Sequence, residues 1–343
     1  MNKAQTVEKA FNNATRSKQI HEAILFVENL KGNFSLNFGY GGKNIHSPLL
    51  MASITKLFTT ACILNLQEQK KLSLDNYVAD YFDKTVMNGL HIYKGEDYSH
   101  KLTLSDLLFQ TSGLPDWFEE GGVKMLIGQK DFRITFKEML ANIKALSPRF
   151  APRSSNKSFY SDINFDLLGE IIEKVAQTPL EKAYQDYIFN PLGLTKTYLP
   201  TNDNDFIPNI YYKNESLHRP NLIISCRASG GGITTAQELM QFLKAFFNGS
   251  LFPQSIFQKL SIYRKLQLTM IPIHYGGGYM QIPMNTANTL FIGKGELIGH
   301  SGTTGSFAFH YPHKDLYFVG DLNQMANPSL PIRLVMKLAM TIK

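Results

Sequence analysis

The stretch Met51-Ala52-Ser53-Ile54-Thr55-Lys56-Leu57-Phe58 places a hydroxyl and an amine three residues apart at the start of an apolar segment. Because a helix turns about 100° per residue, residues three apart are surface neighbours, so the Lys56 amine can reach the Ser53 hydroxyl. A serine hydroxyl is a weak nucleophile until a neighbouring base accepts its proton. Free N–H groups in the first helical turn can also bind a developing oxyanion. The stretch predicts a nucleophile, Ser53, beside a proton-transfer group, Lys56.

The same Ser-x-x-Lys spacing also arises by chance in helices whose serine is an N-cap and whose lysine is solvated. The expected helix is apolar on nearly every side, with Leu57, Phe58, Ala61, Cys62, Leu64 and Leu66. A helix that is apolar all round is buried, and a buried lysine needs a polar partner or a function. This context favours the catalytic interpretation.

A second candidate group, Tyr160-Ser161-Asp162, lies just ahead of a helix expected from Asn164 to Val175. A tyrosine hydroxyl has a pKa of about 10 and can transfer a proton where a nearby ammonium favours its ionised form. The alternative is structural, with Tyr160 packed in the core and Asp162 as the helix N-cap.

The third candidate group, Gly299-His300-Ser301-Gly302-Thr303, lies at the end of an expected strand. Its glycines let a substrate approach the strand edge closely, and the N–H of Thr303 can complete an oxyanion hole with that of Ser53. His300 can orient or protonate a leaving group, or bind a carboxylate when charged. A glycine-flanked turn with a solvated histidine is the structural alternative.

The composition is that of a globular protein. Its 343 residues suffice for one large domain or two joined ones, and 43% of them are hydrophobic. The formal net charge is +7, yet the lysines and arginines are scattered singly, so we expect no nucleic-acid partner. No apolar run approaches the length of a spanning helix, so we expect no transmembrane segment.

Several further expectations concern compartment and cofactors. The first 20 residues lack the apolar core of a secretory signal, so we expect a cytoplasmic protein, although a chain trimmed of its leader would look the same. Cys62 and Cys226 are expected as free thiols. His310 and His313 are too weak a pair for a zinc site, and the glycines at 230–232 indicate close backbone approach rather than a phosphate loop. We expect no metal and no cofactor.

The hydrophobic pattern predicts a mixed α/β fold. The runs 23–27 and 34–38 read as a hairpin, and the periodicity from 75 to 226 is mainly helical. Further strands are expected at 275–282, 290–292, 297–300, 306–311 and 316–322, before a last helix over 331–342. The first hairpin can complete this sheet only if the two ends of the chain meet.

The order of the three groups resembles the serine β-lactamase and penicillin-binding protein superfamily. The likeness is greatest to the branch of class C β-lactamases, DD-peptidases, D-aminopeptidases and family VIII esterases. It spans nearly the whole chain, through the segments 102–114, 164–173, 191–194 and 231–232. The resemblance implies an α/β (α+β) fold, with an antiparallel sheet flanked by helices in residues 1–75 and 228–343. A mostly helical domain, 76–227, is inserted into it, and the site lies in the cleft.

Carried over by position, the resemblance implies Ser53 as the acylated nucleophile and Lys56 with Tyr160 as the proton-transfer pair. The N–H groups of Ser53 and Thr303, the latter beside Gly302, would bind the oxyanion.

Two positions depart from the family pattern. Asp162 stands where asparagine is frequent, and His300 where many members have lysine. A carboxylate near Lys56 would hold the lysine charged, and the change at 300 removes a permanent cation for a substrate carboxylate. We therefore expect peptidase or esterase activity rather than efficient β-lactam hydrolysis.

The preferred hypothesis is a metal-free serine hydrolase that cleaves an amide or ester through an acyl-enzyme on Ser53. Its substrate would be a D-amino-acid peptide, a β-lactam or a small ester. The alternative is a catalytically idle member that binds peptidoglycan-like peptides or a protein partner in the same cleft. The sequence leaves open the substrate, the oligomeric state, and which of Lys56 and Tyr160 is the general base.

Overall fold

The computed structural model describes residues 2–128, 130–154 and 156–342. Its centre is an eight-stranded antiparallel sheet in the order β2-β1-β14-β13-β12-β11-β10-β9. The strands are β1 (Ala23–Asn29), β2 (Ser35–Tyr40), β9 (Arg264–Lys265), β10 (His274–Tyr275), β11 (Met280–Pro283), β12 (Glu296–Ser301), β13 (Ser306–Tyr311) and β14 (Leu316–Asp321). This confirms the predicted fold class, an antiparallel sheet flanked by helices.

Six short strands form pairs outside this sheet. They are β3 (Pro48–Leu50) with β8 (Ile233–Thr235), β4 (Ile92–Tyr93) with β5 (Glu96–Asp97), and β6 (Ile210–Tyr212) with β7 (Glu215–Leu217). The β3·β8 pair matters for the site because it joins the segment before Ser53 to the glycines at 230–232.

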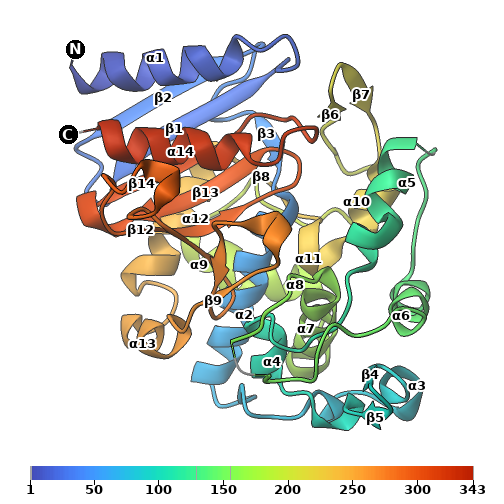
Figure 1. The fold of residues 1–343 in the computed structure, drawn as a ribbon. Coiled ribbons are helices and arrows are strands. Elements are labelled where there is room, and N and C mark those ends of the chain that lie inside the picture. Colours follow the sequence, from blue (N-terminus) through green and yellow to red (C-terminus); the bar gives the residue numbers. More distant parts are fainter. Residues whose placement is uncertain (1, 129, 155, 343) are drawn as a thin grey trace.

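The two ends of the chain meet in the sheet, as the sequence required. β1 pairs with β2 on one side and with β14 on the other, and Ile24 lies opposite Asp321. Helices α1 (Lys3–Thr15) and α14 (Leu330–Thr341) lie side by side over the sheet (Figure 1). α12 (Ala236–Asn248) packs against β1, β13 and β14. All six residues of β14 are buried, so helices cover both faces at this point.

The remaining helices lie mostly between the two sheet-forming parts of the chain. They are α2 (Thr55–Glu68), α3 (Lys84–Met87), α4 (Leu104–Leu108), α5 (Val123–Gly128), α6 (Phe136–Lys144), α7 (Asp162–Ala176), α8 (Leu180–Tyr184), α9 (Asn190–Leu192), α10 (Pro220–Ser225), α11 (Arg227–Gly230) and α13 (Phe257–Leu260). α2 is buried on nearly every side, as predicted, and packs against α7 and α11. The Phe58 ring of α2 stacks on Phe242 of α12 with 3.6 Å between centroids.

Two predicted strands need correction. The predicted strand 275–282 is divided by a turn into β10 and β11, which pair with each other. The predicted strand 290–292 is wrong, because these residues form a turn after a 3₁₀ segment, Ala287–Thr289, and are 80%, 72% and 75% exposed. Leu290 donates to the Ala287 carbonyl and Ile292 to the Thr289 carbonyl, so these amides close turns instead of pairing with a strand. Three apolar residues in a row had suggested a buried strand, but short apolar runs do not identify their own partner.

The sheet takes its strands from residues 23–40 and 264–321, with α2 to α13 between them. The division into domains at 75 and 228 stays a prediction, and α7 packs directly on α2 across it. Within the described residues, no helix combines the length and the apolar character needed to cross a membrane.

Candidate active site

Ser53 lies in a 3₁₀ turn, Ala52–Ile54, that leads directly into α2. The turn is held from behind, since the Met51 N–H donates to the Gly232 carbonyl (2.8 Å) and the Gly232 N–H donates to Thr55 Oγ1 (3.0 Å). A Cβ on Gly231 would lie 2.8 Å from the Ile223 carbonyl oxygen and 2.9 Å from the Arg227 nitrogen. These backbone contacts confirm the close backbone approach predicted for the glycines.

Lys56 is fully buried, and its ammonium group contacts three acceptors. Nζ lies 3.2 Å from Ser53 Oγ, 2.6 Å from the Ser229 carbonyl oxygen and 2.6 Å from Asp162 Oδ1. The contacts with Ser53 and Ser229 are hydrogen bonds and the contact with Asp162 is an ion pair, so the geometry suits a charged lysine. Asp162 is the first residue of α7, and the N-cap position belongs to Ser161.

Tyr160 lies against this pair, with its ring centroid 5.0 Å from Lys56 Nζ. Its Oη makes no hydrogen bond within the part of the chain that the structure describes, although the Ser53 hydroxyl is near enough to lower its pKa. Burial, followed by the Asp162 carboxylate, raises the pKa of Tyr160 well above its usual value. The phenol is therefore neutral in this arrangement and is suited to donate a proton.

His300 is fully buried and does not line the cavity that Ser53 and Tyr160 line. Its Nδ1 donates to the Ser301 carbonyl (2.8 Å), and its Nε2 lies 3.4 Å from Tyr275 Oη. Burial and the nearby Lys56 ammonium lower the pKa of His300 to about 3. The ring is neutral, so position 300 supplies no cation to a substrate.

The turn after β12 is linked by hydrogen bonds to the segment that precedes Ser53. The Gly302 N–H donates to the Ser306 carbonyl (2.8 Å), and Ser306 Oγ donates to the Met51 carbonyl (2.8 Å). Among the described residues, the backbone N–H groups of Ser53 and Thr303 make no hydrogen bond to a turn carbonyl or to a side chain. Both residues line the same cavity, as the predicted oxyanion hole requires.

This cavity has a volume of about 700 Å³ and brings together most of the predicted residues. Ser53, Tyr160, Asp162, Gly302 and Thr303 all line it. Much of the remaining wall is apolar, with Phe118, Val123, Met270, Ile271, Pro272, Ile273, Met280, Ile332, Met336 and Met340.

Sequence reasoning missed two acidic residues of the cavity, Asp116 and Glu119. Burial, and next the Asp162 carboxylate, raises the pKa of Asp116 well above its usual value. Burial also raises the pKa of Glu119. These two residues lie in the loop after Leu114-Pro115, and nothing in the sequence indicates which side chains of this loop point inward. Among the described residues, no group of three His, Cys, Asp or Glu side chains is arranged to hold a metal ion.

Comparison with known proteins identifies the family of this chain. The family model described as Beta-lactamase matches residues 44–335. The chain belongs to the Beta-lactamase family. This match includes all three candidate groups, from Ser53 to Thr303.

Curated relatives in this family cover part of the chain. Protein flp of Staphylococcus aureus (strain MRSA252) is 31% identical over 191 residues, which are 53% of this chain and 35% of that protein. A putative D-alanyl-D-alanine carboxypeptidase of Escherichia coli O157:H7 is 32% identical over 150 residues, 43% of this chain and 32% of that protein. The chain thus spans about a third of the length of these relatives.

Solved structures match over nearly the full length. A D-stereospecific amidohydrolase from Streptomyces sp. has a TM-score of 0.76 at 24% identity, covering 94% of this chain and 95% of that one. The D-amino acid amidase from Ochrobactrum anthropi SV3, complexed with L-phenylalanine amide, has a TM-score of 0.78 at 16% identity, covering 98% of both chains. At these identities the likeness establishes the fold.

Proposed function

We propose that this Beta-lactamase family member is a serine hydrolase that cleaves an amide or ester bond through an acyl-enzyme on Ser53. The observation that carries the proposal is the buried Lys56 ammonium, which bridges Ser53 Oγ and Asp162 Oδ1 at the wall of a 700 Å³ cavity. A binding groove alone has no need for a buried lysine beside a serine hydroxyl.

The protonation states of these side chains suggest how the first step proceeds. Ser53 Oγ bonds to the substrate carbonyl carbon while its proton passes to Lys56, which releases one of its own protons to Asp162. The amides of Ser53 and Thr303 bind the resulting oxyanion. Tyr160 then donates its phenolic proton to the leaving nitrogen or oxygen as that bond breaks, and the Lys56–Asp162 pair restores it. Water reverses the sequence to release the acid.

The carboxyl groups in the cavity suit a substrate with a free amino group. These carboxyl groups belong to Asp116, Glu119 and Asp162. The cations that line the cavity, Arg333 and Lys337, come from α14, whereas the neutral His300 contributes none. The apolar wall suits a hydrophobic side chain. An amino-acid amide or amine-terminal peptide with an apolar side chain fits this combination. The D-amino acid amidase among the similar structures acts, by its name, on an amide of this general type.

A substrate panel tests the proposal. Wild-type protein should hydrolyse D- or L-phenylalanine amide faster than nitrocefin, and a fluorophosphonate should add its mass to the peptide that contains Ser53. Ser53→Ala should lose both labelling and turnover, while the matched variant Ser250→Ala, at an exposed serine, should keep them.

A lack of labelling and turnover would contradict the proposal. If wild-type protein stays unlabelled and turns over no amide, ester or β-lactam, the hydrolase proposal is wrong. Tight binding of a peptide without acylation would then favour the catalytically idle alternative.

A further inference from the structure

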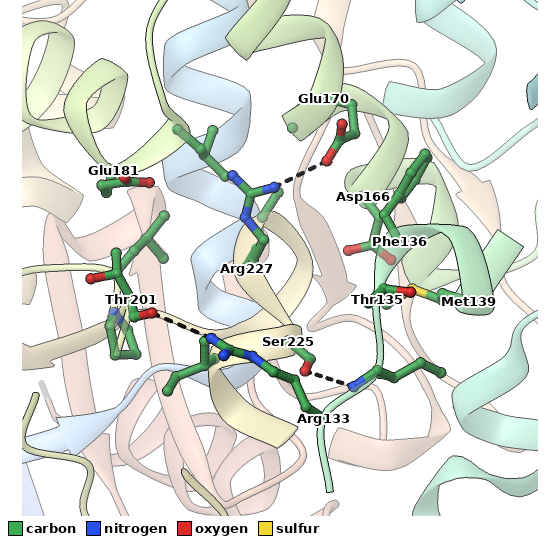
Figure 2. Close-up of a pocket in the computed structure, with 17 residues that line it drawn as sticks. Arg133, Thr135, Phe136, Met139, Asp166, Glu170, Glu181, Thr201, Ser225 and Arg227 are labelled. Carbon is green, nitrogen blue, oxygen red and sulfur yellow. Dashed lines mark hydrogen bonds and ion pairs between the residues drawn. The ribbon is translucent and has the colours of Figure 1, made fainter. Parts of the chain in front are cut away.

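A second cavity, of about 310 Å³, lies further along α7 and shares no lining residue with the catalytic cavity. Segments of α6, α7, α8, α10 and α11, with residues 199–201, enclose this α7 cavity (Figure 2). Its volume is at the lower end of the range of about 300–1,000 Å³ found for small-molecule sites. Its apolar lining residues are Ile134, Phe136, Met139, Leu180, Leu199, Pro200, Ile224 and Ala228.

Asp166 presents a carboxyl oxygen, Oδ2, to this cavity without a hydrogen-bond partner among the described residues, although the Ser229 hydroxyl is near enough to lower the pKa of this carboxyl group. Its side chain comes from the middle of α7, and Figure 2 shows it directed toward the centre of the lining residues. The residue is only 7% exposed. Buried carboxyl oxygens are nearly always hydrogen-bonded, so an orphan that faces a cavity points to a missing ligand donor.

The two arginines that line the cavity differ in how they are paired. Arg227 forms ion pairs with Glu170 (3.0 Å) and with Glu173. Arg133 donates to the Thr201 carbonyl (3.3 Å) and forms no ion pair with any described residue. The cavity therefore combines a carboxyl group with an unpartnered oxygen, a guanidinium without a carboxylate, and an apolar wall.

We propose that the α7 cavity is a second binding site, for a small zwitterionic amino acid whose ammonium pairs with Asp166 and whose carboxylate pairs with Arg133. The apolar wall would receive an aliphatic side chain. A planar guanidinium is the preferred donor to a carboxylate, and a buried carboxylate is the preferred acceptor for an ammonium. Nothing in the catalytic mechanism uses either residue.

Burial, and next the Asp162 carboxylate, raises the pKa of Asp166 to about 8, so the empty site holds a proton at neutral pH. An arriving ammonium would displace that proton. The other charged or titratable groups around Asp166 are Asp162, Glu170, Lys56, Arg227, Arg133, Glu181, Asp116 and Cys226. Asp162 lies one helical turn before Asp166 and pairs with Lys56. Occupancy of the α7 cavity would therefore alter the electrostatic field at Ser53.

Isothermal titration calorimetry with D- and L-leucine tests this site. At least one enantiomer should bind, and the binding heat should vary with the ionisation enthalpy of the buffer because a proton is released. Isopentylamine and 4-methylpentanoate, which each lack one charged group, should bind at least about fivefold more weakly. Asp166→Asn should weaken leucine binding by more than about tenfold, and Arg133→Gln by about two- to fivefold.

Matched variants separate the two cavities. Asp186→Asn and Arg16→Gln, both at exposed positions, should bind leucine like the wild type. Binding that is lost in Glu119→Gln but kept in Asp166→Asn would place leucine in the catalytic cavity and overturn the proposal. The absence of binding of either enantiomer to wild-type protein would overturn it as well. Arg133→Gln changes an exposed side chain, so it serves as the test even if Asp166→Asn fails to fold.

Discussion

Asp166→Asn should stabilise the protein by an amount that grows with pH. Burial, with the Asp162 carboxylate as the second cause, raises the pKa of Asp166 from 3.8 to about 8 in the folded protein. An aspartate in an unfolded chain titrates near its ordinary value. Between these two values the folded protein binds a proton that the unfolded chain has lost, so the stability of the wild type falls as the pH rises. Asparagine does not titrate and has no such dependence.

The size of the effect follows from the linkage relation. In the window between the two pKa values, each pH unit changes the difference in unfolding free energy by about 1.4 kcal/mol. From pH 5 to pH 7, the variant should therefore gain roughly 3 kcal/mol relative to the wild type. For a chain of this size the gain corresponds to an increase of about 5 °C in the difference between melting temperatures. A fixed cost of burying the asparagine amide would shift all values equally and leave the slope unchanged.

Differential scanning calorimetry of both proteins at pH 5, 6, 7 and 8 measures this slope directly. Asp186→Asn is the matched control, because the Asp186 side chain is 45% exposed and its pair with Lys182 is solvated. Its difference from the wild type should stay nearly constant with pH. If the Asp166→Asn difference were equally constant from pH 5 to pH 8, the argument that Asp166 is buried in its protonated form would be refuted.

Three further substitutions test the packing and the cavity. Gly302→Ala should lower the free energy of unfolding in denaturant by about 1–3 kcal/mol and slow acylation of Ser53, because the new Cβ would lie 2.7 Å from the Met51 carbonyl oxygen. Gly121→Ala is the control, because its Cβ meets open space, and it should have neither effect. Phe58→Ala removes a fully buried ring stacked on Phe242 and should cost about 3–5 kcal/mol in urea unfolding. Glu119→Gln should raise KM for phenylalanine amide and leave KM for a nitrophenyl butyrate ester unchanged, a pattern that equal changes for both substrates would contradict.

Much of the fold was predictable because its signals are local. The buried α2 follows from an all-apolar helical stretch, and α4 begins at Thr103, whose side chain accepts from the Asp106 N–H. The hairpin β1·β2 follows from two apolar runs around a polar turn. The prediction of a strand at 290–292 was wrong because three apolar residues carry no information about whether a partner strand lies beside them.

The candidate site divides in the same way. The Ser53–Lys56 contact depends on helical spacing, so the sequence predicted it. The partners that make Lys56 an ion-paired ammonium, Asp162 and the Ser229 carbonyl, lie more than a hundred residues away in the chain and meet it only through packing. Their presence at Nζ depends on how α7 and α11 close on α2.

By itself, the sequence determined which side chains carry the proposed chemistry, because nucleophile, amine, phenol and strand-end glycines are read from residue type and short spacing. Only the tertiary structure decided their charges. Protonation depends on burial and on neighbours brought from remote segments, which is why His300 is neutral and Asp166 is a buried acid. The α7 cavity also exists only in the folded chain, since five helices and residues 199–201 enclose it.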